Sequence, residues 1–259
     1  MAIQSVQRAL TILTLFSAEN PRLGITEISK AMNLPKPTAH GLVKTLKTEG
    51  FLVQDSETRK YSLGLKIYEL GVFLSGTLKV NQIGGPTAQR LSKDTEHMTR
   101  VAIWDRDMVL ITLNLFPTID DSFLFRQLGL GPRVPAYCSA VGKSILSTFS
   151  PEEIDAYIVR TDFVQFTSKT IISGKKLKSE IEKVKKNGFA TECEESFNGL
   201  ACISMPVYDN TGKAEAAISV SGATDLLESP ELPAIKASLK QAAMEISIGM
   251  GCPPSLLYK

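Results

Sequence analysis

The side chains that most often carry enzymatic chemistry are scarce and scattered in this sequence. His40 and His97 are its only histidines, and its four cysteines form no CxxC pair. A serine or cysteine nucleophile needs a base within hydrogen-bonding reach, and no nucleophile signature lies beside His97, which we expect to be solvated. The residue types therefore favour neither a hydrolase nor a metal site nor a disulfide framework, and we expect no catalytic residue and no cofactor.

The segment AVGKS (residues 140–144) ends in GKS, as phosphate-binding loops do. That motif also needs a glycine five residues before its second glycine, where this chain has Tyr137. The match fails, and Lys143 is expected to be exposed, as most lysines are. Cys202 lies between two apolar residues of an expected strand, where it can be a small core residue or part of a cavity wall.

The stretch NLPKPTAHGLVKTLKTEGFL (residues 33–52) indicates binding rather than catalysis. A helix that begins near Lys36 has one apolar side at the spacing of a face that packs on a core: Ala39, Leu42, Val43 and Leu46. Its opposite side is polar, positive and without carboxylates: Pro37, Thr38, Gly41, Lys44, Thr45 and Thr48. Solvated helix faces usually mix Glu with Lys, so this side is expected to meet a partner.

The elements around this helix follow the order of a winged helix-turn-helix. Residues 5–17 predict a first helix, with its buried side along Val6, Leu10, Leu13 and Phe16. Thr26 is expected to cap a short second helix, and residues 51–63 predict a hairpin with Arg59 and Lys60 at its tip. In such a fold the second main helix enters the major groove of DNA. A solvated face or a protein contact is the alternative.

The candidate DNA contacts divide into two kinds. Thr38, His40 and Lys44 suit the groove edge, and the remaining basic residues suit phosphates. The full candidate set is Thr26, Lys36, Pro37, Thr38, His40, Gly41, Lys44, Thr45, Lys47, Arg59 and Lys60. The net charge of +2 also hides an asymmetry, because residues 1–80 hold ten basic and six acidic side chains. A surplus of four is a weak indication of a nucleic-acid partner by itself.

The length of 259 residues, with 43% hydrophobic and 22% charged residues, predicts two globular domains. No apolar run is long enough for a membrane span, and the start lacks the sections of a signal peptide, so we expect a cytoplasmic protein without a membrane partner. Residues 65–80 are apolar on nearly all sides and predict a helix covered by a second copy of the chain. The Gly84-Gly85-Pro86 segment is expected to break the chain and to mark the domain boundary.

Beyond this boundary, the pattern mixes hairpins with helices. Strands are expected at residues 99–105 with 108–115, and at 200–207 with 213–222. Helices are expected at 86–96 and 139–148, after the Ser150 capping box, at 173–187 and at 231–250. This arrangement predicts an α+β fold with a largely antiparallel sheet.

Taken together, the motifs resemble those of the IclR family of transcriptional regulators over essentially the whole chain. The similarity rests on SVQRALTIL, GITEISKAMNLPKPTAHGLVKTLKTEGFL and KYSLGLKIYELG in the first part, and on GPRVPAYCSAVGKSILS, ECEESFNG and NGLACISMPVYDNTGKAEAAISVSG in the second. The resemblance implies a winged helix-turn-helix DNA-binding domain (1–64), a linker helix with a dimer contact (65–84) and a GAF-like effector-binding domain (85–259). It also implies homodimers or tetramers on double-stranded operator DNA.

The sequence departs from the family pattern at three positions. Family members usually carry serine at position 37 and arginine at 41, where this chain has Pro37 and Gly41. One guanidinium contact to DNA is therefore missing, and the operator sequence is expected to differ. The pattern also favours histidine at 137, so Tyr137 argues against a metal-dependent variant.

The resemblance further implies a pocket for a small-molecule effector, an organic or aromatic acid. Matched motif by motif, its residues are Ser139, Ala140, Glu192 or Glu195, Cys202, Ser219 and Ser221. A helix that starts at Ser139 offers free N–H groups to an anion, and Ser219 and Ser221 point to the same side of a strand. Small residues that fill a tight core are the alternative for this serine pair.

These observations lead to one functional hypothesis and two alternatives. The hypothesis is a transcriptional regulator in which metabolite binding to the second domain alters operator binding. One alternative is a DNA-binding oligomer whose second domain senses nothing. The other is a metabolic enzyme whose first domain is an accessory interaction module.

Overall fold

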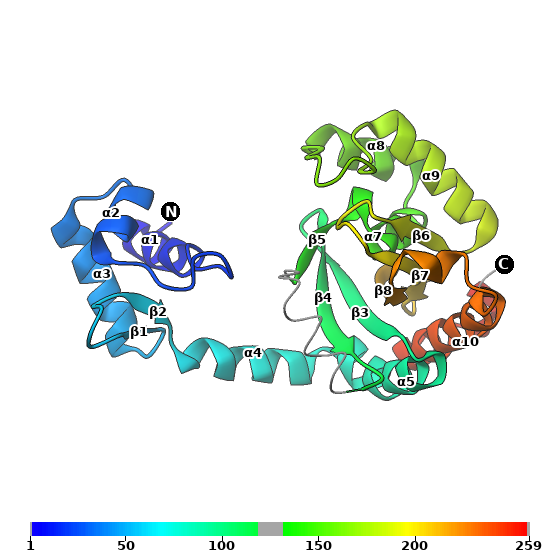
Figure 1. The fold of residues 1–259 in the computed structure, drawn as a ribbon, viewed down its shortest axis with the longest axis horizontal. Coiled ribbons are helices and arrows are strands. Elements are labelled where there is room, and N and C mark those ends of the chain that lie inside the picture. Colours follow the sequence, from blue (N-terminus) through cyan, green and yellow to red (C-terminus); the bar gives the residue numbers. More distant parts are fainter. Residues whose placement is uncertain (1, 119–131, 258–259) are drawn as a thin grey trace. The chain divides into compact units, whose positions relative to one another are not determined.

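The computed structural model describes residues 2–118 and 132–257 (Figure 1). Residue 131, which begins the GPRVPAYCSAVGKSILS motif, lies outside these ranges. Backbone contacts divide the chain into two compact units, one up to Gly76 and one from Thr77 onward. Within the described residues, no helix is long and apolar enough to cross a membrane.

The N-terminal unit is a winged helix-turn-helix, as the order of its patterns predicted. Its elements are α1 (Gln4–Leu13), α2 (Ile25–Ala31), α3 (Lys36–Thr48), β1 (Leu52–Gln54) and β2 (Tyr61–Leu63). β1 and β2 form an antiparallel hairpin, and Leu23 joins it through an isolated bridge to Tyr61. Pro37 occupies the first turn of α3, where the N–H that proline lacks would have no partner in the helix.

The core of this unit confirms the apolar side of α3 and corrects that of α1. Val43 and Leu46 pack with Ile28 of α2. The predicted burial of Val6 and Leu10 is wrong, because their exposed fractions are 52% and 60%. The buried residue of α1 is instead Ile12, so the helix packs on the unit with a different side from the one its own periodicity favoured.

The expected capping role of Thr26 is also wrong. Gly24 is the N-cap of α2, and Thr26 lies inside the first turn of the helix. The Glu27 carboxylate reaches back and accepts a hydrogen bond from the Gly24 backbone N–H. The glutamate in the first turn therefore satisfies the backbone donor of the N-cap residue, and the N-cap, being a glycine, has no side chain to accept from the N–H groups of the first turn.

Helix α4 (Leu65–Thr77) follows the winged domain and buries none of its residues. Six of its large apolar side chains are between 48% and 80% exposed: Leu65, Tyr68, Leu70, Val72, Phe73 and Leu74. The sequence predicted an apolar helix here, and in the structure the N-terminal unit does not bury the apolar side chains of this helix.

The expected chain break at Gly84-Gly85-Pro86 is wrong. Helix α5 (Lys79–Thr95) runs through this segment with Pro86 inside it. Gly84 is buried, and a β-carbon added there would contact the Ile246 side chain of α10 (Leu232–Met250). Close packing of these two helices explains why a residue with poor helix propensity occurs here, because burial outweighs local propensity.

A six-stranded sheet forms the centre of the C-terminal unit. Its strands lie in the order β5-β4-β3-β8-β7-β6, and every pair is antiparallel within the described residues. The strands are β3 (Met98–Asp105), β4 (Met108–Leu115), β5 (Arg133–Pro135), β6 (Ala190–Cys193), β7 (Ala201–Tyr208) and β8 (Ala214–Gly222). The α+β class and the antiparallel sheet are thereby confirmed.

Helices cover both faces of this sheet (Figure 1). One core lies between the sheet and α5 with α10, and a second lies between the sheet and α7 (Ala140–Leu146), α8 (Pro151–Arg160) and α9 (Gly174–Asn187). Short 3-10 helices occur at Ala136–Cys138, Thr224–Leu227 and Pro254–Leu256. The Ser150 capping box begins α8, as predicted, and Gly188 ends α9 in the left-handed conformation.

Candidate nucleic-acid interface and effector cavity

The solvent side of α3 presents the predicted set of residues. Lys36, Thr38, His40, Lys44 and Lys47 are all exposed, and so are Pro37, Gly41 and Thr45. The Thr45 hydroxyl donates to the Gly41 carbonyl, and the Lys47 Nζ donates to Gln54 Oε1 of β1 at 3.1 Å. Among the described residues, no carboxylate lies within ion-pair distance of Lys36 or Lys44. Their charges are therefore available to an external anion.

The wing between β1 and β2 presents a second cationic point. The Asp55 carboxylate accepts hydrogen bonds from the backbone N–H groups of Glu57 and Thr58, which fixes the turn and lowers the pKa of Asp55. Arg59 follows in the left-handed region with φ 58° and is exposed. Lys60 is half-exposed and pairs with Glu27 at 3.6 Å, so it is less available than Arg59.

In the C-terminal unit, polar side chains gather on one face of four adjacent strands. The register places Glu192 opposite Cys202 and Cys202 opposite Ser221. It also places Ser219 opposite both Ser204 and Arg100. Directly paired residues and residues two apart share a face, so all six lie on the side of the sheet that faces α7.

These groups enclose a cavity of about 20 Å³, which is room for about one water molecule. Its walls include five of the predicted effector residues: Ser139, Ala140, Glu192, Cys202 and Ser219. The other lining residues are Arg100, Val134, Val141, Ser196 and Leu200. Glu195 and Ser221 do not line it, although the buried Ser221 hydroxyl has no hydrogen-bond partner among the described residues.

The Glu192 carboxyl is the most strongly perturbed acid of the cavity. Burial, together with repulsion from Glu195, raises its pKa to about 7. The backbone N–H groups of Glu195 and Ser196 each donate to its Oε2 at 3.2 Å, and the Ser196 hydroxyl donates to Oε1 at 3.1 Å. Burial also raises the pKa of the Cys202 thiol to about 12, so this sulfur is uncharged near neutral pH.

The start of α7 offers less to an anion than its sequence indicated. Ser139 is the N-cap, and its hydroxyl oxygen accepts a hydrogen bond from the Gly142 N–H at 3.2 Å. The Ser139 hydroxyl in turn donates to the Pro135 carbonyl at 2.9 Å. These internal bonds already occupy part of the binding capacity that an anion would use.

Comparisons with known proteins identify the family. The family model described as "IclR helix-turn-helix domain" matches residues 5–56, and "Bacterial transcriptional regulator IclR C-terminal" matches residues 74–248. The chain belongs to the IclR family of transcriptional regulators. It is 33% identical to the Escherichia coli HTH-type transcriptional regulator XynR, over 97% of this chain and 98% of that protein. It is 30% identical to E. coli KdgR, over 96% and 94%.

Solved structures agree with the IclR fold. A putative transcriptional regulator from Rhodococcus sp. RHA1 superposes with a TM-score of 0.80 at 23% identity, covering 96% of this chain and 98% of that one. An IclR homologue from Microbacterium hydrocarbonoxydans, complexed with 4-hydroxybenzoate, gives 0.77 at 19% identity, with 95% and 98% covered. At these identities the two structures support the fold alone.

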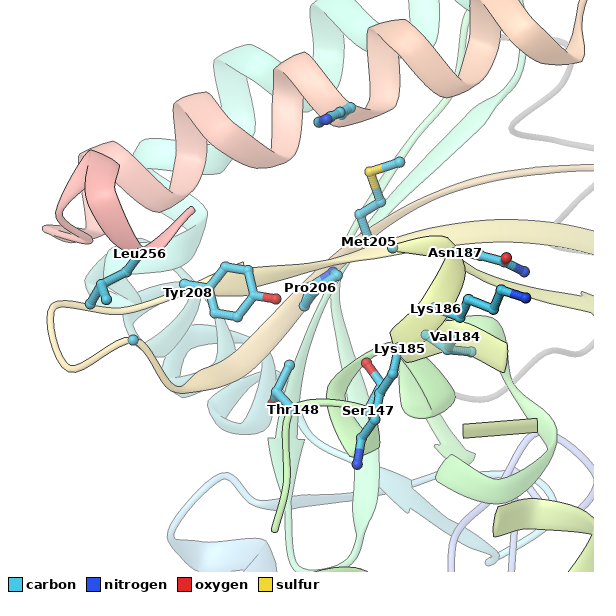
Figure 2. A pocket seen from close by; sticks show the side chains of 13 residues that line it. Ser147, Thr148, Val184, Lys185, Lys186, Asn187, Met205, Pro206, Tyr208 and Leu256 are labelled. Carbon is cyan, nitrogen blue, oxygen red and sulfur yellow. The ribbon is translucent and has the colours of Figure 1, made fainter. Parts of the chain in front are cut away.

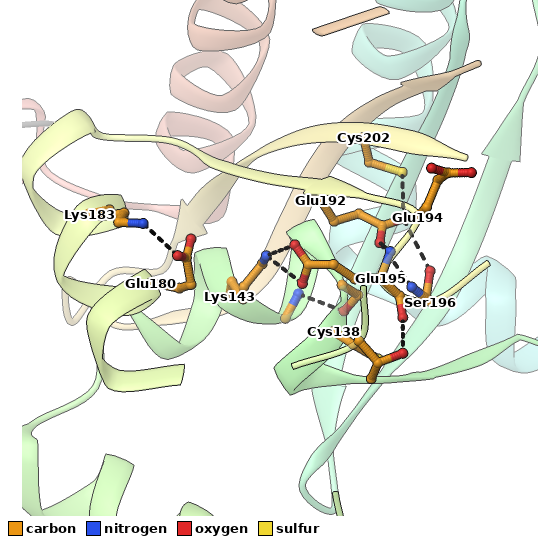
Figure 3. A network of polar contacts seen from close by, with 12 residues as sticks. Cys138, Lys143, Glu180, Lys183, Glu192, Glu194, Glu195, Ser196 and Cys202 are labelled. Carbon is orange, nitrogen blue, oxygen red and sulfur yellow. Dashed lines mark hydrogen bonds and ion pairs between the residues drawn. The ribbon is translucent and has the colours of Figure 1, made fainter. Parts of the chain in front are cut away.

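In this IclR-family regulator, Lys143 does not have the exposed position that its sequence predicted. Its side chain is 1% exposed, and its Nζ lies 2.6 Å and 2.8 Å from the two carboxylate oxygens of Glu195 (Figure 3). Burial raises the pKa of Glu195, and the Lys143 charge opposes this effect. Glu195 is therefore the partner of a buried lysine and not a lining residue of the cavity.

Arg100 is the charged residue of the cavity that the sequence motifs did not predict. It is 7% exposed on β3, directly opposite Ser219. Burial lowers its pKa, while the negative forms of Cys202 and Glu192 act in the other direction. A basic residue in the largely apolar run TRVAIW was the available signal, because arginine is almost never fully buried unless it is paired.

A larger groove, of about 520 Å³, lies on the surface elsewhere in the same unit (Figure 2). It is lined by the ends of α7 and α9, by β7 and by α10, with Lys185, Lys186 and Lys240 among its residues. None of the predicted effector residues lines it. The groove is therefore larger and lies at the surface, whereas the cavity under α7 is smaller and is lined mostly by buried residues.

Proposed function

We propose that this regulator binds a pseudo-palindromic DNA operator as a homodimer through α3, and that a small carboxylic acid bound in the cavity under α7 alters this affinity. The main support for DNA binding is the exposed side of α3, which has no carboxylate and on which Lys36 and Lys44 form no ion pair within the described residues. Such a side suits the major groove, and the wing residue Arg59 suits an adjacent phosphate. A chromosomal operator places the protein in the cytoplasm.

The exposed apolar surface of α4 supports the dimer. The large side chains named above have no cover within their own unit, and contiguous apolar surface of this kind marks a protein–protein contact. A two-fold dimer would present two copies of α3 to half-sites about one helical turn or more apart. A tetramer formed from two such dimers is compatible with the same surface.

Substitution of Lys44 tests the proposed interface. The probe is a duplex that the wild-type protein selects from a random pool, titrated by fluorescence anisotropy at several salt concentrations. Lys44→Ala should weaken binding by about tenfold and lower the dependence of log K on log salt by about one, because one phosphate or base contact is lost. Lys183→Ala, which removes the same charge from α9, is the matched control and should change neither quantity.

Two results would contradict the proposal. If Lys44→Ala and Lys183→Ala bind the duplex equally well, α3 does not contact DNA in the proposed way. If the wild-type protein ignores duplex DNA even at low salt, the DNA-binding function itself is wrong, because phosphate attraction is strongest there.

The small volume of the cavity favours one alternative, a regulator whose second unit serves only assembly. Calorimetry with organic acids separates the two, since this alternative predicts no heat of binding. The enzyme alternative gains no support from the cavity, where the Cys202 thiol is uncharged near neutral pH and no histidine is among the lining residues.

A further inference from the structure

Arg100 distinguishes this cavity from an ordinary well-packed core. A guanidinium is costly to remove from water, and it cannot lose its charge near neutral pH. Here it lies on the same sheet face as Glu192, Ser219 and Cys202, where the neighbouring pair Ala102 and Ala217 belongs to the apolar core under α7. The polar character is therefore confined to one end of this face, at the cavity.

The chemistry of the walls defines what the cavity can recognise. The guanidinium offers a fork of donors that matches a carboxylate, and Glu192 with the hydroxyls of Ser139, Ser196 and Ser219 offers groups that match alcohol or carbonyl oxygens. The apolar lining residues are all aliphatic: Val134, Ala140, Val141 and Leu200. No aromatic ring lines the cavity within the described residues, and Phe197, which packs against Ala140, Leu200 and Cys202, is not among the lining residues. A flat aromatic acid would leave several of the polar groups unmatched.

We propose that Arg100 anchors the carboxylate of a small hydroxylated aliphatic acid, and that Glu192 and the cavity serines bind the hydroxyl groups of this ligand. The proposal rests on the proposed sensing function and narrows its ligand class. A carboxylate held by both arms of the guanidinium gains two parallel charge-assisted hydrogen bonds. Each ligand hydroxyl would replace the contacts that the buried carboxyl and serine groups otherwise make with one another.

Binding must enlarge the cavity, because a volume of about 20 Å³ holds about one water molecule. The wall that can move is the connection between β6 and β7, which supplies Ser196 and Leu200. The first part of this connection is held in place, since Thr167 and Thr170 donate to the carbonyls of Glu194 and Glu195. Displacement is therefore expected after Glu195. It breaks the two hydrogen bonds that Ser196 donates to Glu192, and the ligand must offset this free-energy cost.

The test is calorimetry on the full-length protein with matched probes. Glycerate and gluconate carry a carboxylate and hydroxyl groups, glycerol and glucitol are their neutral counterparts, and benzoate and 4-hydroxybenzoate are the aromatic acids. At least one hydroxy acid should bind, and its polyol should not. Arg100→Gln should weaken that binding by about 100-fold, and Arg100→Lys by about tenfold, because lysine keeps the charge without the fork.

Controls separate loss of binding from loss of folding. Arg160→Gln removes the same kind of charge from an exposed position of this unit and should leave binding unchanged. Fluorescence of Trp104, the only tryptophan, reports whether each variant is folded. If Arg100→Gln does not fold, Arg100→Lys and the comparison of each acid with its polyol in the wild-type protein still test the proposal.

The outcomes distinguish this proposal from the function on which it rests. Equal affinity of the hydroxy acid for the wild-type protein and a folded Arg100→Gln variant would overturn the role of Arg100 and leave sensing intact. Binding of aromatic acids alone, with a change in operator affinity, would overturn the ligand class and also leave sensing intact. If no acid binds, both the proposal and the sensing function fail, while operator binding through α3 stands as a separate result.

Discussion

Replacement of Lys143 by methionine should destabilise the C-terminal unit in a pH-dependent way. The side chain is 1% exposed and its Nζ contacts both oxygens of Glu195, whose own side chain is 15% exposed (Figure 3). Methionine preserves the straight apolar stem and removes only the charge. The variant therefore leaves a buried carboxylate without its cation, and breaking such a pair typically costs about 3–5 kcal/mol.

Protonation of Glu195 limits the part of this cost that comes from its unpaired charge. From its ordinary value of 4.5, neutralising a carboxyl at about pH 7.5 requires about 4 kcal/mol, at about 1.4 kcal/mol per pH unit. The expected loss there is about 3–4 kcal/mol, and at about pH 5.5 the penalty for the unpaired charge falls to about 1.4 kcal/mol, so the total loss should be clearly smaller. Burial raises the folded-state pKa of Glu195, and this pKa should rise further when the Lys143 charge is removed. The folded variant then binds more protons than its unfolded chain. Its stability therefore decreases as the pH increases.

Urea unfolding followed by tryptophan fluorescence measures this loss. Trp104 is the only tryptophan and packs against Phe149 and Tyr157, with ring centroids 5.0 Å and 5.6 Å away, so its emission reports on this unit. Lys169→Met is the matched control, because Lys169 pairs with Glu194 at 2.6 Å but is 54% exposed. Its unfolding midpoint should change little at either pH.

A double variant provides an internal check on the argument. Lys143→Met with Glu195→Gln removes both charges and should recover most of the stability lost in Lys143→Met at about pH 7.5. If Lys143→Met costs the same at both pH values, or no more than the Lys169 control, the contact with Glu195 is not a buried ion pair in solution and the reasoning is refuted.

Three further predictions concern backbone packing and assembly. Gly41→Ala should stabilise α3 by about 0.5–1 kcal/mol, because its β-carbon would meet open space, and hydrogen exchange of the α3 amides measures this gain. Gly142→Ala should instead cost about 2–3 kcal/mol in urea unfolding, since its β-carbon would overlap the Ala136 backbone; a neutral result would contradict the packing described. Phe73→Asp on the exposed surface of α4 should dissociate the dimer in sedimentation experiments, whereas Val159→Asp should leave it intact, although Val159 on α8 is even more exposed than Phe73. A Phe73→Asp variant that remains dimeric would remove α4 from the interface.

Local sequence signals predicted the elements that depend on a few neighbouring residues. The apolar spacing of Val43 and Leu46 placed α3 and its buried side correctly, because a helix repeats its faces within each few residues. The Ser150 capping box and the Gly188 end of α9 were also identified correctly. Each of these signals involves residues within about one helical turn of one another, so the local sequence contains all the groups that interact.

Five residues of the expected effector site line one cavity, and motif similarity rather than periodicity brought them together. Their alignment across β6, β7 and β8 depends on strand register, which no single segment encodes. Arg100 completes the site from β3 and was missed for the same reason. A polar residue in a strand pattern indicates that one face of the strand is polar at that point. It does not indicate which side chains of other strands lie beside it.

The sequence by itself determined the helix-turn-helix, the carboxylate-free side of α3 and the antiparallel hairpins of the second unit, because their causes are local spacing and caps. Only the tertiary structure decided that Lys143 is buried, that α5 continues through Pro86, and that Arg100 lines the same cavity as Glu192. In each case the deciding partner lies far along the chain, on Glu195, on α10 or on β6. The free energy of a buried charge or a closely packed glycine depends on its contact with that partner. This contact forms only when the fold brings the two segments together.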